Sequence, residues 1–191
     1  MSDVTQRKYQ NAQDKENREA VLVAVIARVD SYNPTKMTVD VTPLSMHLEN
    51  GKYQSQPPIL GVPCSTFSGG GFIVRPFYKK GDIGYVTFCD HDIDRVLMGG
   101  KECEPNTERN HSNSDALGFI GIRPFNLPVT GLPEGAFVIA AEGGTPCLAV
   151  TKDNVRVIGD LDVSGTLTAG GVNVNRHTHT DSMGGQTTGP Q

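Results

Sequence analysis

The sequence lacks tryptophan, and its other aromatic residues are confined to one part of the chain. Among 191 residues there are 5 Tyr and 7 Phe, and none of them lies between Val138 and Gln191. Large aromatic side chains normally supply much of the area that a globular core buries. The last 54 residues are therefore not expected to build a conventional core of their own.

The chain also lacks an excess of basic side chains, with 17 Lys and Arg against 21 Asp and Glu and a net charge of −4. That balance argues against a general binder of nucleic acids or anionic membranes. No apolar run approaches the ~18 residues of a membrane span, and the first twenty residues, polar and charged, offer no secretory h-region. The 4 cysteines show no CxxC spacing. We expect a protein made in a cytosol with reduced thiols.

Glycine, with 22 residues, and proline, with 12, are frequent and separate short apolar runs. This pattern predicts an all-β protein rich in turns. Five short strands joined by Gly, Pro and Asp turns favour a Greek-key barrel of the OB-fold type over residues 19–107. The strands are predicted at residues 20–29, 37–41, 59–62, 81–88 and 94–98. Residues 1–18 alternate in charge and read as an arm, and residues 108–135 read as a connector of loops.

Residues 136–175 carry apolar side chains at nearly every second position, from Val155 and Val157 to Val172 and Val174, with glycines between them. Short strands of Val, Leu, Thr and Ser with glycine turns suit a slender β-helix or β-prism in which several chains intertwine. One chain alone would leave these rows exposed. The segment is therefore predicted to be a shaft built from several copies.

The shaft leads into residues 176–191, which contain the pair His177 and His179. Two imidazoles at i and i+2 on an extended segment point the same way and can bind one metal ion. Two ligands are too few for a tight site, so the others must come from elsewhere, and further copies of the same chain are the simplest source. Both rings are expected to face the axis of the shaft.

The number of chains that assemble determines how many nitrogens can bind the metal. Two chains would supply four nitrogens, which suits tetrahedral zinc, and three chains would supply six, which suits an octahedral site. Three is preferred because a three-faced prism closes without free sheet edges. Such a site suits a borderline divalent ion such as iron, nickel or zinc. With no open coordination position, its role would be structural.

Other patterns are weaker. The stretch from His177 to Asp181 begins the HxHxDH signature of metallo-β-lactamase-like hydrolases, but Ser182 stands where the final histidine belongs. Residues 74–80 interleave basic and aromatic side chains, as single-strand binders do, yet a turn or protein contact fits the acidic chain better. His91 with Asp90, Asp92 and Asp94 is interpreted as a polar turn. No nucleophile elbow or P-loop occurs, so we expect no enzyme and no small-molecule substrate.

Several segments closely resemble the central spike proteins of contractile-tailed bacteriophages. The specific part is the C-terminal apex with His177-Thr178-His179, and the barrel resembles the OB domain of these spikes only moderately. The matching stretches are residues 165–172, 177–179 and 184–190 at the apex, and 81–88, 90–94, 113–116 and 121–124 in the barrel.

The resemblance implies a homotrimer in the virion, at the tip of the tail baseplate. Its OB domain would attach to the tail hub, a triple-stranded β-helix would form the shaft, and the apex would hold one iron ion per trimer in six histidines, His177 and His179 of each chain. The spike would pierce the bacterial outer membrane mechanically during tail contraction, without binding nucleic acid. The alternatives are a trimeric receptor-binding fibre or adhesin and, less well supported, an OB-fold nucleic-acid binder.

Overall fold

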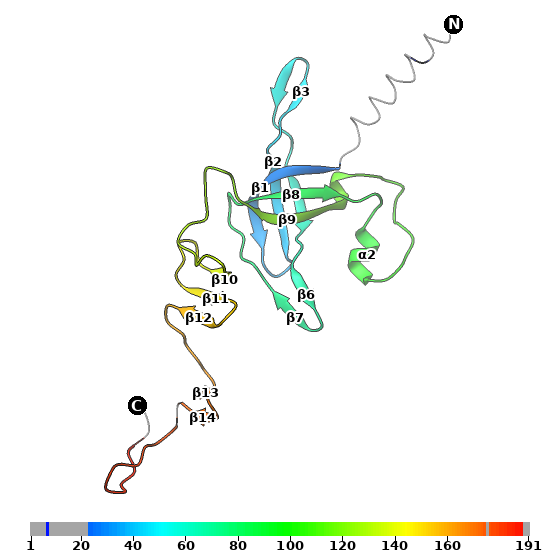
Figure 1. Cartoon of the computed structure of the whole chain (residues 1–191). Helices are drawn as coiled ribbons and strands as arrows, with labels where there is room; N and C mark the ends of the chain where they lie inside the picture. Colours follow the sequence, from blue (N-terminus) through cyan, green and yellow to red (C-terminus); the bar gives the residue numbers. More distant parts are fainter. Residues whose placement is uncertain (1–6, 8–22, 175, 189–191) are drawn as a thin grey trace. The chain divides into compact units, whose positions relative to one another are not determined.

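The structure is a computed structural model that describes Arg7 and residues 23–174 and 176–188. The chain divides into two compact units, residues 1–127 and 128–191 (Figure 1). The predicted arm over residues 1–18 lies outside the described residues, apart from Arg7. Within the described ranges, no helix has the length and apolar character needed to cross a bilayer.

The first unit is built on a five-stranded antiparallel sheet in the order β5-β2-β1-β8-β9. Its strands are β1 (Ala24–Asn33), β2 (Thr38–Pro43), β5 (Ile59–Pro63), β8 (Ile83–Phe88) and β9 (Ala116–Ile122). The sheet curls (Figure 1). Its two outer strands meet, because Cys64 just after β5 forms a parallel bridge with Gly118 in β9, and the Ser65 N–H donates to the Gly118 carbonyl at 2.9 Å.

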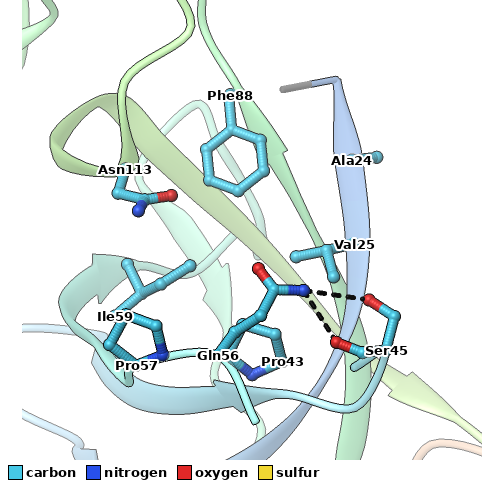
Figure 2. A pocket seen from close by; sticks show the side chains of 9 residues that line it. All are labelled: Ala24, Val25, Pro43, Ser45, Gln56, Pro57, Ile59, Phe88 and Asn113. Atoms are coloured by element: carbon cyan, nitrogen blue, oxygen red, sulfur yellow. Dashed lines mark hydrogen bonds between the residues drawn. The ribbon is translucent and has the colours of Figure 1, made fainter. Parts of the chain in front are cut away.

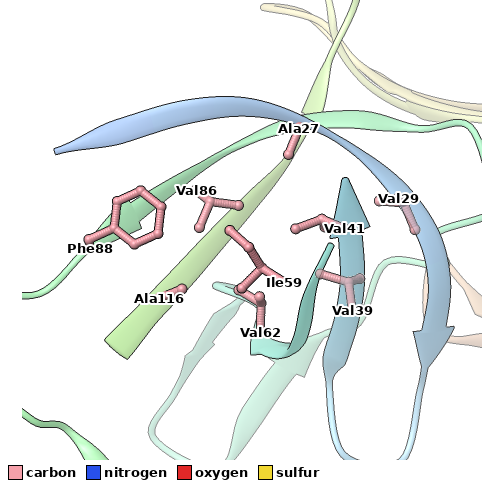
Figure 3. Close-up of a cluster of buried hydrophobic side chains, with 9 residues drawn as sticks. All are labelled: Ala27, Val29, Val39, Val41, Ile59, Val62, Val86, Phe88 and Ala116. Atoms are coloured by element: carbon pink, nitrogen blue, oxygen red, sulfur yellow. The ribbon is translucent and has the colours of Figure 1, made fainter. Parts of the chain in front are cut away.

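This connectivity is that of a five-stranded, partly open Greek-key barrel, so the predicted all-β class with an OB-type barrel is confirmed. Successive side chains of a strand point to opposite faces of the sheet, so both β2 and β8 bury every second residue in the core. The core side chains come from all five strands and, apart from Phe88, are small or branched (Figure 3). They are Ala27, Val29, Val39, Val41, Ile59, Val62, Val86, Phe88 and Ala116.

Two hairpins extend the barrel. They are β3–β4 (His47–Glu49 and Lys52–Gln54) and β6–β7 (Phe67–Gly69 and Phe72–Val74). Both turn over two residues with positive φ, Asn50-Gly51 and Gly70-Gly71. A two-residue turn of this kind matches the right-handed twist of its strands, and Asn-Gly and Gly-Gly adopt it most easily.

Two expectations for this unit are wrong. Residues 94–98, predicted as a strand, belong to helix α2 (Asp94–Gly99), which ends at Gly100 in the left-handed conformation. The fifth barrel strand is instead β9, preceded by the 3-10 turn η1 (Asn113–Asp115). The barrel therefore extends to Ile122, past the predicted boundary at residue 107. A short apolar run such as Val96-Leu97-Met98 fits a helix as well as a strand, and its glycine stop favours the helix.

The second unit contains an antiparallel sheet of β10 (Phe137–Ala140), β11 (Cys147–Val150) and β12 (Val155–Ile158). A hairpin follows, β13 (Thr168–Ala169) and β14 (Val172–Asn173), turned by Gly170-Gly171. Among its described apolar side chains only Cys147 and Ala149 are buried. The strand character of residues 136–175 agrees with expectation, and the intertwined shaft stays a prediction.

Candidate metal centre

The two histidines of the C-terminal segment lie side by side. The ring centroids of His177 and His179 are 4.8 Å apart and their planes meet at 87°. His177 is half-buried and His179 is exposed. The backbone from His177 to His179 is neither helical nor turned. In an extended segment the side chains of residues i and i+2 point to the same side, so both imidazoles lie together, as the sequence predicts.

A small turn holds the pair. Thr180 bridges to Gln186, the His179 N–H donates to Thr187 Oγ1 at 2.9 Å, and the Thr187 N–H donates to the His179 carbonyl at 2.9 Å. Within the turn, Asp181 Oδ1 accepts from the N–H groups of Met183 at 2.9 Å and Gly185 at 2.7 Å. An aspartate that binds the backbone ahead of it is a common turn device. These hydrogen bonds hold the segment that carries His179 in place.

A hydrogen bond of His177 determines which of its two ring nitrogens is available to bind a metal. His177 Nδ1 lies 2.9 Å from the carbonyl oxygen of Val174. A carbonyl only accepts, so Nδ1 donates this hydrogen bond, and in the neutral ring Nε2 then keeps the lone pair that a metal needs. Ligating histidines commonly donate their second nitrogen in this way. The arrangement fits a borderline divalent ion bound through Nε2.

One chain supplies only this pair. In the described residues, the one cluster of three or more metal-ligating side chains is Asp92, Asp94 and Asp115, in the first unit. His177 and His179 thus offer two imidazole nitrogens, which fit iron, zinc or nickel in type but not in number. Completing a tetrahedral or octahedral shell would need further ligands.

The three-aspartate cluster is already filled by Arg109. Its Nε and one terminal nitrogen reach the two oxygens of Asp115 at 2.6 and 2.9 Å, and a terminal nitrogen lies 2.9 Å from Asp94 and 3.2 Å from Asp92. Asp115 and Asp92 are buried. Asp115 Oδ1 also accepts from the Ile93 N–H at 3.0 Å, and Thr107 donates to Asp92 at 2.8 Å. A guanidinium paired with three carboxylates suits a structural clasp between the start of α2, the loop after it and η1.

The pKa values follow from this pairing. The hydrogen bonds from Arg109 are the main reason that the pKa of Asp115 is lowered, against burial, which raises it. At Asp92 burial also raises the pKa, but the Asp94 N–H, Thr107 and Arg109 together outweigh it and the pKa is lowered. Both carboxylates are thus held ionised. The sequence reading of His91 and its neighbours as a simple turn missed this clasp.

The remaining candidates do not form a site. His91 Nδ1 lies 3.0 Å from the Asn110 side chain, and His111 Nε2 lies 2.9 Å from Asp90. In the segment of residues 74–80, Tyr78 packs against the core and Phe77 contacts Tyr32 edge to face at 6.1 Å.

A pocket lies beside the start of β1 and β5 and the end of β8. Its volume is about 180 Å³, and Val25, Ile59 and Phe88 lie around it (Figure 2). The Gln56 amide nitrogen crosses it to the carbonyl of Ser45 at 2.7 Å (Figure 2). Ligand sites usually measure ~300–1,000 Å³, so this pocket is small for a substrate.

Fold and sequence together define a β-barrel domain of the OB type joined to a C-terminal unit that lacks a substantial core of its own. The chain belongs to the family of the phage protein Gp138 N-terminal domain, whose model matches residues 25–121. That match coincides with the barrel from β1 to β9. A comparison with curated proteins found no match. The protein is thus a phage protein, and a place in the virion is consistent with this membership.

Proposed function

We propose that the protein is the central spike of a contractile phage tail, a homotrimer that pierces the outer membrane of the host when the tail contracts. Membership of a family of phage proteins supports a role in a phage. The observation that carries the proposal is an uncovered face of the β10–β12 sheet.

This apolar face is defined by cross-strand register. Ile139 lies opposite Leu148, which lies opposite Val157, and the neighbouring row runs from Phe137 through Val150 to Val155. Residues paired in this way share one side of the sheet. All six are apolar, and each exposes between 38% and 71% of its surface. A sheet face without a single polar side chain is suited to burial against another protein surface.

Further copies of the same chain are the covering that we propose. Three such faces packed about a common axis would bury one another and leave no uncovered apolar side. Covering the six half-exposed side chains would contribute about 6 kcal/mol per chain. The unit itself buries only Cys147 and Ala149 among its described apolar residues, so this contribution would dominate its stability. The shaft and its assembly would therefore form together.

The same assembly would complete the metal centre. Three copies would bring six imidazoles, from His177 and His179 of each chain, to one ion. Iron is the proposed ion, at one per trimer, and zinc or nickel would suit the same nitrogens. The bound ion would supply structural cross-linking only. The turn at Asp181 and the bond from His177 to Val174 would hold the rings ready for it.

A clamp at this end suits a piercing part. A unit that buries few apolar side chains is prone to local unfolding, and a tip that frayed would not concentrate force. Metal that binds only the assembled form would stabilise it by linkage. Sheath contraction would supply the force, the barrel would attach to the tail hub, and no catalysis would be involved.

Immuno-electron microscopy of phage particles tests the proposal. Antibodies against residues 23–127 should label the central tip of the baseplate. Label on peripheral fibres would support the adhesin alternative and contradict the spike. A gel-shift assay with single-stranded DNA at low and high salt tests the nucleic-acid alternative, for which we expect no shift.

A further inference from the structure

The β6–β7 hairpin carries a second exposed apolar surface, and it lies on the barrel. Phe67 lies opposite Val74 and Gly69 lies opposite Phe72, so three apolar side chains share one face of the hairpin. Phe67 exposes 85% of its surface, Phe72 82% and Val74 58%. An isolated two-stranded hairpin is marginally stable in water. A hairpin that presents two phenylalanines to solvent is expected to be covered.

A groove continues this face onto the barrel. It measures about 550 Å³ and is lined by Phe67 and Val74 of the hairpin together with Pro76, Tyr78 and Phe119. Phe119 stacks on Tyr85, with ring centroids 4.9 Å apart and planes 7° apart, which fixes the far wall. None of the described residues that line the groove is charged. Its ligand is therefore apolar, not an ion or a phosphate.

We infer that this aromatic surface, formed by Phe67, Phe72, Val74, Pro76, Tyr78 and Phe119, joins the barrels of neighbouring copies, the hairpin of one seated in the groove of the next. Phe72, which does not line the groove, supplies the projecting apolar side chain, and the groove beside Phe67 and Val74 supplies an apolar hollow. Such a head-to-tail contact between unlike surfaces closes into a ring when the rotation allows. The inference rests on the proposed trimer.

The area of the surface favours a second copy over a free partner. The exposed parts of these side chains amount to on the order of 500 Å² per copy. A stable interface between independent proteins needs ~800 Å² from each side. This surface falls short of that, so a partner arriving from solution would be held weakly. Copies already joined through the C-terminal unit would face one another at an effective concentration in the millimolar range, at which a weak contact is occupied.

A photo-crosslinking amino acid at position 72 of the full-length chain tests the inference. Phe72 is exposed near the hairpin turn, so a larger aromatic fits without repacking the core. After irradiation and full denaturation we expect a covalent product of two chains, with the link mapped by mass spectrometry to residues 74–78 or 119–121 of the second chain. The same probe at position 67 repeats the test from the other strand.

The control is the same probe at Tyr53 on β4, which exposes 71% of its surface on the other hairpin and should give no two-chain product. Light scattering on each sample separates two failures. A three-chain assembly that yields only one-chain products, or links mapped elsewhere, overturns the inference and leaves the proposed trimer standing. A sample of single chains overturns both.

Discussion

His177 and His179 present their rings edge to face at a centroid distance of 4.8 Å, on a segment that leads into the turn at Asp181. Two imidazoles so placed can belong to one metal shell, and two nitrogens alone do not complete such a shell. The account of the tip depends on this pair.

Replacing either histidine should therefore remove the metal. In a trimer, His177→Ala or His179→Ala deletes three of six ligands at once, and we expect the affinity for the ion to fall by more than ~10-fold. Elemental analysis of the purified variants measures this. Thr178→Ala, between the two rings, is the matched control and should keep the metal. Unchanged metal content in both histidine variants would remove the site.

The close packing of β8 against β9 can be tested at Gly84. A Cβ added there would lie 2.5 Å from the Phe119 carbonyl oxygen and 2.7 Å from the Ile120 Cα, which are backbone atoms of β9. Gly84→Ala should cost about 1–3 kcal/mol because one strand must shift. Gly69→Ala, with nothing within 4 Å of the added atom, should be close to neutral. All 5 tyrosines precede residue 128, so tyrosine fluorescence during thermal unfolding reports on the barrel.

The Arg109–Asp115 clasp should make the barrel sensitive to acid. Because hydrogen bonds from Arg109 lower the pKa of Asp115, its contribution is present above the pKa of an unfolded aspartate, ~3.9, and is lost as the pH falls through the lower pKa of the folded state. The lowered pKa of Asp92 acts in the same direction. The barrel should therefore lose stability below about pH 4.

The variant Asp115→Asn isolates this effect. At pH 7 it leaves Arg109 without its bidentate partner, and we expect the thermal midpoint to fall by roughly 10 °C. Between pH 7 and pH 3 its urea midpoint should change less than that of the wild type. Glu104→Gln, at an exposed position of the same loop, should follow the wild type. An equal acid response in all three proteins would refute the role of the clasp.

The apolar face should control assembly. Val157→Asp would place a carboxylate from each copy against the apolar side chains of its neighbours, and the cost of burying it should dissociate the trimer. Arg156→Asp changes the neighbouring residue on the opposite side of β12 and should leave the assembly intact. Light scattering of both variants gives the mass. A three-chain mass for Val157→Asp would show that this face is not the interface.

Much of the barrel could be predicted from the sequence because its strands alternate. The period of two in residues 37–41 and 81–88 marks β2 and β8. The hairpins β3–β4 and β6–β7 were not predicted, although Asn-Gly and Gly-Gly at their turns favour a hairpin. Strand β9 was missed because Gly118 and Gly121 interrupt its apolar run and suggest a loop. Gly118 is in fact where the barrel closes, beside Val62 at 3.4 Å from an added Cβ. A contact between strands so distant in sequence leaves no local signal.

The candidate sites also differ in how much of each could be predicted from the sequence. His177 and His179 are two residues apart, so alternation alone brings them together. The clasp joins Asp92 and Asp94 to Arg109 and Asp115, and only the folded loop makes them neighbours. The apolar face was visible in part, as rows of Val and Leu. Its register across three strands required the structure.

The most direct test of the central claim is the ratio of metal to chain in a single chromatographic peak of known mass. Light scattering gives the number of 20.5 kDa chains in the peak, and elemental analysis of the same fraction gives its metal. The account predicts three chains and one ion, iron in the first instance. A peak of single chains without bound metal would contradict it.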